Sequence, residues 1–246
     1  MSPWKITTSL LASVLLAACG ANEVVVQGQF PSPVLEKVPV TLGVHYSEEF
    51  RGHEFFDQAS ARGESDWMVR TGDAQVRMYD ALLGGMFERV VHLDELPWAE
   101  PVEAAAETVA ETGVQTGAAS LDAILVPHVD ELQYAIPLHT KINVFEVWMR
   151  YRYELYSPEG EILADWTMTC YGKTPTAFMQ GAEAAVNLAA VMALRDAGAN
   201  FAISFTKVAE VGQWLEQFQS GADETPRNGK APGIVPHLPA GREENP

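Results

Sequence analysis

Residues 145–172, FEVWMRYRYELYSPEGEILADWTMTCYG, decide the fold. Up to Tyr156, apolar side chains alternate with polar or aromatic ones, which is the period of a strand with one buried face. The apolar set is Phe145, Val147, Met149, Tyr151, Tyr153 and Leu155. Ser157-Pro158-Glu159-Gly160 has the composition of a turn, and residues 162–172 alternate again. The stretch therefore predicts an antiparallel hairpin.

The second face of this hairpin is polar but rich in aromatic residues. It carries Glu146, Trp148, Arg150, Arg152, Glu154 and Tyr156, opposite Asp165, Thr167 and Tyr171. Aromatic residues and Arg are enriched in protein interfaces, which makes an interaction surface possible here. That surface would consist of Trp148, Arg150, Arg152, Tyr156 and Tyr171. The alternative, slightly favoured because two long helices are available, is that a helix covers this face or that Arg and Asp pair across the strands.

The residues before the hairpin predict further strands and a helix. Residues 38–46, VPVTLGVHY, predict a buried strand, and the apolar spacing over 71–90, with Thr71 or Asp73 as cap, predicts a helix that turns into a short strand. Gly84-Gly85 predicts close packing or fraying near the end of that helix. Residues 122–137 predict a third strand, with Pro127 at a bulge or an edge.

After the hairpin, Thr174-Pro175 is expected to open a long helix whose alanines permit close approach to a sheet. Its predicted core face carries Phe178, Ala182, Ala185, Leu188, Ala189 and Met192. Residues 208–218 predict a last amphipathic helix. The fold class is therefore α+β: a mostly antiparallel sheet of about five strands, with two to three helices packed on one face.

Composition divides the chain into four parts. Residues 1–18 are expected to be a lipoprotein signal peptide, 19–37 a tether, 38–218 a single α+β domain, and 219–246 a disordered tail. Within the domain, residues 47–67 are expected to be irregular, and residues 97–117, acidic and rich in Ala and Thr, to be a mobile insertion.

The amino terminus carries an export signal. Lys5 precedes an uncharged apolar stretch over residues 6–18 that is too short to span a bilayer, and Leu16-Ala17-Ala18-Cys19 follows. This resembles the lipobox of bacterial lipoproteins, which implies that lipid is attached to Cys19. In such lipoproteins, Asp directly after the cysteine retains the protein in the inner membrane. Gly20 stands at this position, which implies that the protein is transported to the outer membrane and faces the periplasm. The alternative is an ordinary secretory signal with a chance Cys.

Charge restricts the partners. The net charge is −17, and it becomes −18 when residues 1–18 are removed with Lys5. Such a chain repels phosphate backbones and anionic headgroups, so we expect no nucleic-acid partner. Two or more acyl chains hold a protein stably, and we therefore expect the membrane to be reached through Cys19 rather than through basic patches.

No motif predicts catalysis, a metal or a cofactor. Gly172-Lys173-Thr174 lacks the earlier glycine of a phosphate-binding loop and is expected in a strand-to-helix connection. In a strand, His128 and Asp130 share one face and Glu131 lies on the other. Two side chains on a face are too few ligands for zinc, so we expect the hydrogen bonds of His128 to be satisfied by neighbouring residues. Cys170 falls on an apolar strand face and is expected to be buried. We therefore expect a protein that is not an enzyme.

Residues 43–51, GVHYSEEFR, and 146–175, EVWMRYRYELYSPEGEILADWTMTCYGKTP, resemble proteobacterial outer-membrane lipoproteins with no established activity. In element order the chain is also similar to the periplasmic α/β modules of TolB, curli-secretion and cell-wall-synthase-activating lipoproteins. Those proteins bind other envelope proteins, so the resemblance implies a non-enzymatic accessory or protein-binding subunit of an envelope complex. The alternative is a carrier that holds a lipid or another apolar ligand between helices and sheet.

Overall fold

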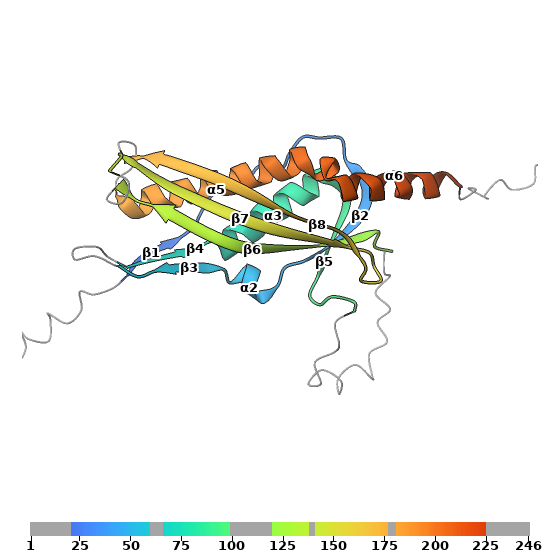
Figure 1. The fold of residues 1–246 in the computed structure, drawn as a ribbon, viewed down its shortest axis with the longest axis horizontal. Coiled ribbons are helices and arrows are strands. Elements are labelled where there is room, and N and C mark those ends of the chain that lie inside the picture. Colours follow the sequence, from blue (N-terminus) through green and yellow to red (C-terminus); the bar gives the residue numbers. More distant parts are fainter. Residues whose placement is uncertain (1–20, 60–65, 99–119, 138–140, 177–180, 225–246) are drawn as a thin grey trace, which may run out of the picture.

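The structure of the chain is a computed structural model that describes residues 21–59, 66–98, 120–137, 141–176 and 181–224. They form a five-stranded sheet, a three-stranded sheet and helices that pack beside them (Figure 1). The predicted α+β class and its five-stranded sheet are confirmed. The second sheet was not predicted from the sequence.

The larger sheet has the strand order β5-β2-β6-β7-β8. The strands are β5 (Phe87–Leu93), β2 (Val38–His45), β6 (Ala123–Ala135), β7 (Val144–Tyr156) and β8 (Ile162–Pro175). β2 runs parallel to both β5 and β6, whereas β6, β7 and β8 are antiparallel. β2 pairs with β6 only as far as Leu125, so Pro127 lies where β6 has become a local edge, as its missing N–H requires.

The predicted hairpin is the β7–β8 pair. Its ladder pairs Tyr151 with Met168 and continues in regular register to Val144 and Pro175. The apolar set of β7 is buried, and the turn closes with a hydrogen bond from the Gly160 N–H to the Ser157 oxygen at 3.0 Å. The period-two pattern therefore identified both strands and the face that each one buries, except at Ile162, which a register shift before Ala164 leaves 63% exposed.

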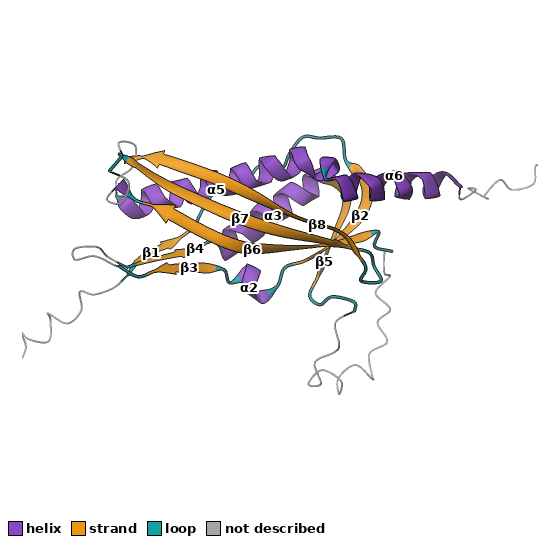
Figure 2. Cartoon of the chain, in the orientation of Figure 1, coloured by secondary structure: helices purple, strands orange, loops and turns teal. Residues whose placement is uncertain are grey.

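Two helices cover the buried face of this sheet (Figure 2). They are α3 (Gly72–Met86) and α5 (Ala182–Ser204). The alanines of α5 bring its backbone against β8: a Cβ added at Gly172 would lie 2.0 Å from the Ala189 carbonyl oxygen. One helical stretch among the described residues, Ala182–Lys207, is long and apolar enough to span a bilayer, but half of it is buried against the rest of the protein.

Aromatic rings fill the space between helices and sheet. The fully buried rings include Tyr79, Tyr151, Tyr153, Phe201 and Phe205. The hydroxyl oxygens of Tyr79 and Tyr153 lie 2.6 Å apart, and Tyr151 donates to the Gln75 side chain at 3.0 Å. Burial raises the pKa of all three tyrosines, so they stay neutral. The three tyrosines thus pack their rings in the core with each hydroxyl paired.

The smaller sheet corrects two expectations. Its strands are β1 (Asn22–Val25), β4 (Trp67–Arg70) and β3 (Glu54–Asp57), in that order. β1 belongs to the segment expected to be a tether, yet it pairs with β4, and Asn187 of α5 then binds the Gln27 backbone at 2.8 Å. The segment expected to be irregular contains β3 and the short helix α2 (Glu48–Arg51). Strands of four residues show too little period to be read from the sequence.

Two element boundaries also differ from expectation. β8 continues through Thr174 to Pro175 because the ladder with β7 does, and α5 begins only at Ala182. After the 3-10 turn η2 (Phe205–Lys207), the predicted amphipathic helix is α6 (Ala209–Glu224), which extends past the expected tail boundary at residue 219. The signal peptide, Cys19, most of the expected insertion, and residues 225–246 lie outside the described residues.

Candidate interaction surface

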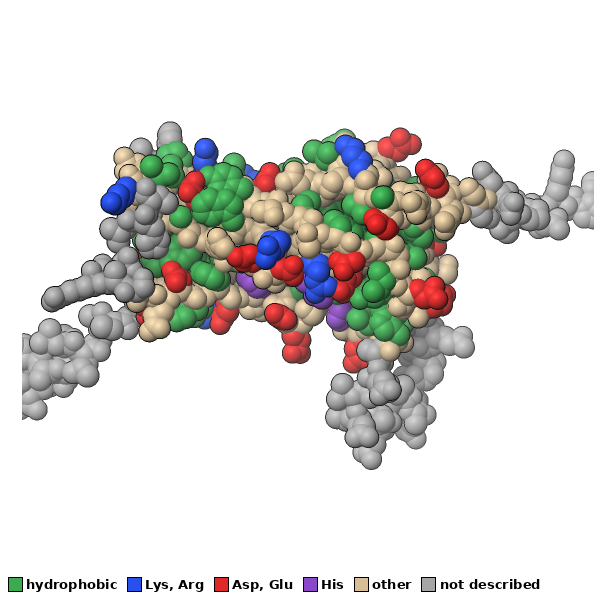
Figure 3. All heavy atoms as spheres, in the orientation of Figure 1, with side chains coloured by type: hydrophobic (Ala, Val, Ile, Leu, Met, Phe, Trp, Pro, Cys, Tyr) green, Lys and Arg blue, Asp and Glu red, His purple; other side chains and the backbone are tan. Residues whose placement is uncertain are grey.

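The face of β6, β7 and β8 that points away from α3 and α5 carries the predicted surface residues. No helix of the described chain lies across this face, which Figures 1 and 3 show from its front. Basic and acidic side chains gather along its middle (Figure 3). The two long described helices, α3 and α5, which the sequence offered as a cover, lie on the opposite face instead.

Trp148 and Tyr171 form an aromatic pair at one end of the face. Their ring centroids lie 5.1 Å apart, because the two residues are direct partners in the β7–β8 ladder. The Tyr171 hydroxyl donates to Glu146 at 2.5 Å, and burial together with this bond raises the pKa of Tyr171 to about 12. A hollow of about 270 Å³ beside Trp148 is also lined by Glu131, Gln133 and Arg150.

Arg150 occupies the middle of the face and is half-exposed. Its guanidinium lies 2.7 Å from Glu131 of β6. Alternation placed Glu131 on the opposite face from His128, and this expectation is wrong. The ladder pairs Val129 with Tyr151 and then Glu131 with Arg150, so Asp130 is an extra residue in a bulge that turns Glu131 outward.

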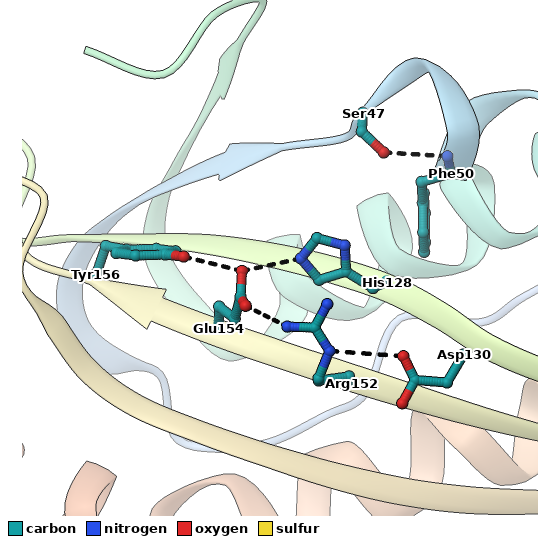
Figure 4. A network of polar contacts seen from close by, with 7 residues as sticks. All are labelled: Ser47, Phe50, His128, Asp130, Arg152, Glu154 and Tyr156. Atoms are coloured by element: carbon teal, nitrogen blue, oxygen red, sulfur yellow. Dashed lines mark hydrogen bonds and ion pairs between the residues drawn. The ribbon is translucent and has the colours of Figure 1, made fainter. Parts of the chain in front are cut away.

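Arg152 and Tyr156 meet at Glu154 on the same strand (Figure 4). Glu154 is bonded to Arg152, accepts from the Tyr156 hydroxyl at 2.9 Å, and lies 3.0 Å from His128 Nε2. Burial would raise the pKa of Glu154, but these three partners lower it below its ordinary value. His128 is thus satisfied by a neighbour, as predicted.

A second polar hollow, of about 250 Å³, adjoins this network where α2 borders the edge of β6. It is lined by Ser47, Glu49, Phe50, His53, His128, Val129, Asp130 and Arg152. Burial lowers the pKa of His53, against the charges of Glu49 and Glu54. His53 Nδ1 lies 2.7 Å from the Thr71 hydroxyl, which therefore makes no capping bond to α3. Nothing in the sequence pattern indicated that His53 approaches His128.

The predicted residues thus line one face but do not form one pocket. Trp148 and Tyr156 are eight residues apart on β7, about 26 Å. The second alternative from the sequence holds in a modified form, because Arg150 pairs with Glu131 and Arg152 with Glu154 and Asp130, rather than with Asp165. Both arginines of this face are therefore paired with carboxylates.

The other candidate residues from the sequence are Cys19, Cys170 and the Gly172-Lys173-Thr174 segment. Cys19 lies outside the described residues, and Cys170 is a free, buried cysteine whose pKa burial raises to about 12. Gly172, Lys173 and Thr174 lie within β8, so they form no phosphate-binding loop. Among the described residues, no three His, Cys, Asp or Glu side chains are grouped so that they could hold a metal ion.

No protein-family model and no curated protein matches the chain. Solved structures that align with it include a Xanthomonas campestris protein of family DUF330, with 14% identity over 82% of this chain and 99% of that chain at a TM-score of 0.45. A candidate lipoprotein from Caulobacter crescentus has 15% identity, and the alignment covers 42% of this chain and 70% of that chain at a TM-score of 0.29. A lipoprotein from Neisseria meningitidis has 12% identity, and the alignment covers 66% of this chain and 88% of that chain at a TM-score of 0.23. These likenesses carry no functional argument.

Proposed function

We propose that this chain is a lipoprotein, anchored through Cys19 in the outer membrane and facing the periplasm, that binds another envelope protein without catalysing a reaction. The observation that carries the proposal is the outer face of β6, β7 and β8. The aromatic core is complete without this face, yet the face presents Trp148, Tyr171 and two arginines held by carboxylates. Aromatic and Arg side chains of this kind are the usual anchors of protein interfaces.

The start of β1 limits how far the domain could stand from its anchor. Asn22 is already paired with Trp67, and only Gly20 and Ala21 lie between it and Cys19. The three Cα-to-Cα steps from Cys19 to Asn22 span at most about 10 Å, so acylation at Cys19 would hold the smaller sheet close to the bilayer. The larger sheet would then project into the periplasm with its outer face free.

A carrier of lipid is the second candidate, and the interior disfavours it. Rings of Tyr79, Tyr153 and Phe201 occupy the space between helices and sheet where such a ligand would lie. An apolar hollow of about 280 Å³ does lie elsewhere, between Pro31, Pro33 and the outer sides of α3 and α5. It is smaller than the usual range for ligand pockets. Native mass spectrometry of the purified protein checks this, since a carrier would retain a ligand mass.

Palmitate labelling in the native host tests the anchor. We expect label on the wild-type chain and on Cys170→Ala, which keeps Cys19, and none on Cys19→Ala. The released Cys19→Ala protein should leave the membrane fraction. Label that persists on Cys19→Ala would contradict acylation at this position.

Crosslinking in intact cells followed by mass spectrometry tests the partner. The variant Trp148→Ala should reduce recovery of the partner at least about tenfold, as loss of an interface anchor does. Phe56→Ala is the matched control, because Phe56 is a half-exposed aromatic residue on β3, away from this face. Failure to recover any reproducible partner, or equal losses from the two variants, would overturn the proposal.

A further inference from the structure

β8 is the last strand of the larger sheet, and its backbone directions can be read from two hydrogen bonds. The Thr176 N–H donates to the Asn143 oxygen at 3.0 Å, toward β7. The Tyr171 N–H donates away from β7, to the Asp196 carboxylate of α5 at 3.0 Å. Directions alternate along an antiparallel strand, and the register is regular from Ala164 onward. Asp165, Thr167 and Thr169 therefore direct their N–H and C=O groups away from β7.

These three residues form an open edge. Within the described part of the chain, no hydrogen bond engages their outward backbone groups, and their side chains are exposed. Natural proteins protect such edges with Pro, Lys, bulges or covering elements. Here Pro175 and Lys173 come only after the open stretch, and Asp165 is its single charge. An edge left open in this way is a template for another strand.

We propose that this edge takes up an extended segment of another protein as a sixth strand of the sheet. The inference rests on the proposed protein-binding function and names its mode, β-strand addition, in which backbone hydrogen bonds supply affinity. The added strand would continue the outer face beyond Thr169 and Tyr171.

The surroundings of the edge specify the segment. On one side, its side chains would stand beside Asp165; on the other, they would meet the stripe of α5 that borders β8, where Asp196 lies between the partly exposed Met192 and Ile203. A segment in which basic and apolar residues alternate complements both rows. The net charge of −17 favours such a cationic partner over a second copy of this chain.

Amide hydrogen exchange on the full-length protein in detergent tests the edge. In the free protein, the amides of Asp165, Thr167 and Thr169 should exchange at least about 100-fold faster than those of Trp166, Met168 and Cys170, which bond to β7. The probe is a nine-residue peptide of alternating Lys and Val with blocked ends. It should slow exchange at the three outward amides at least about tenfold, whereas a Glu-Val counterpart should not.

Thr167→Pro provides the decisive variant because it removes one outward N–H and no bond to β7. It should weaken binding of the probe at least about tenfold, whereas Thr167→Ala, which keeps the N–H, should bind normally. Unchanged slow exchange at Trp166 and Met168 shows that Thr167→Pro is folded. If Thr167→Pro does not fold, the same comparison is made with the Lys-Val peptide in which the central residue and its neighbour are replaced by Pro; this peptide should not bind.

Three outcomes would overturn the inference: no binding of the probe, equal binding by Thr167→Pro, or slow outward amides in the free protein. If the outward amides exchange slowly in the free protein and its measured mass is that of a dimer, the edge is occupied by a second copy of the chain. The probe is added to purified protein, so its binding does not depend on the cellular partner. If the probe does not bind but cells still yield a partner whose recovery depends on Trp148, only the strand-addition inference is rejected. If the probe binds but no such partner is recovered from cells, only the proposed function is rejected.

Discussion

Gly172 and Gly84 show how differently two glycines can be constrained. A Cβ at Gly172 would meet backbone atoms of α5, 2.0 Å from the Ala189 oxygen and 2.3 Å from the Ala193 nitrogen. A Cβ at Gly84, exposed on α3, would meet nothing within 4 Å. The close packing expected near Gly84-Gly85 is found at Gly85 alone, where Pro33 lies against the helix.

Gly172→Ala should therefore destabilise the protein by about 3 kcal/mol or more, because α5 must move away from β8. Gly84→Ala should stabilise it by about 1 kcal/mol through helix propensity. Urea denaturation of both variants measures the two changes. A Gly172→Ala protein as stable as the wild type would contradict the close approach of α5.

His53 makes stability depend on pH. Burial lowers its pKa in the folded protein, whereas the unfolded chain protonates it near pH 6.5. The unfolded state therefore binds more protons just below pH 6.5, and this contribution to stability falls as the pH drops through that value. The free energy of unfolding of His53→Gln should depend less on pH between about 7.5 and 5.5. An unchanged pH dependence in urea titrations would refute this role.

At the residue scale, alternation on β7 predicted correctly which side chains point outward. It failed one strand away, at Glu131, because the bulge at Asp130 shifts the period and no residue type announces a bulge. The approach of His53 to the network also escaped prediction, since it depends on the placement of α2 against β6.

At the element scale, α3 and β7 are joined by the paired hydroxyls of Tyr79 and Tyr153. Tyr79→Phe leaves the Tyr153 hydroxyl buried without its partner, which should cost about 1–3 kcal/mol. The double variant Tyr79→Phe/Tyr153→Phe removes both groups and should cost less than the sum of the single variants. A double-mutant cycle in urea measures the coupling, and additive costs would show that the pair contributes nothing.

Elements with a strong period were predicted and those without one were not. The faces of α3 and of the β7–β8 hairpin follow from spacing, whereas α5 is apolar nearly all round. The expected core face of α5 consequently included Met192, which is 43% exposed. The start of α5 was also misplaced, because Thr174-Pro175 is a common helix opening and only the ladder with β7 shows that the strand continues.

At the scale of the whole molecule, the fold class followed from the order of strands and helices, but the arrangement of two sheets did not. β1 and β4 are four-residue strands separated by more than forty residues, and such distant pairings leave no local signal. If Cys19 is acylated as we propose, this pairing leaves only Gly20 and Ala21 between the anchor and the first strand.

The measurement that tests the central claim most directly is site-specific photocrosslinking in intact cells of the native host. Benzoylphenylalanine placed at Arg150 lies on the outer face, and placed at Arg77 it lies on the exposed side of α3, in the helical layer. We predict discrete, reproducible protein adducts from position 150, none from position 77, and loss of the position-150 adducts when Cys19→Ala releases the protein. Adducts of equal yield from both positions, or none from position 150, would contradict the account.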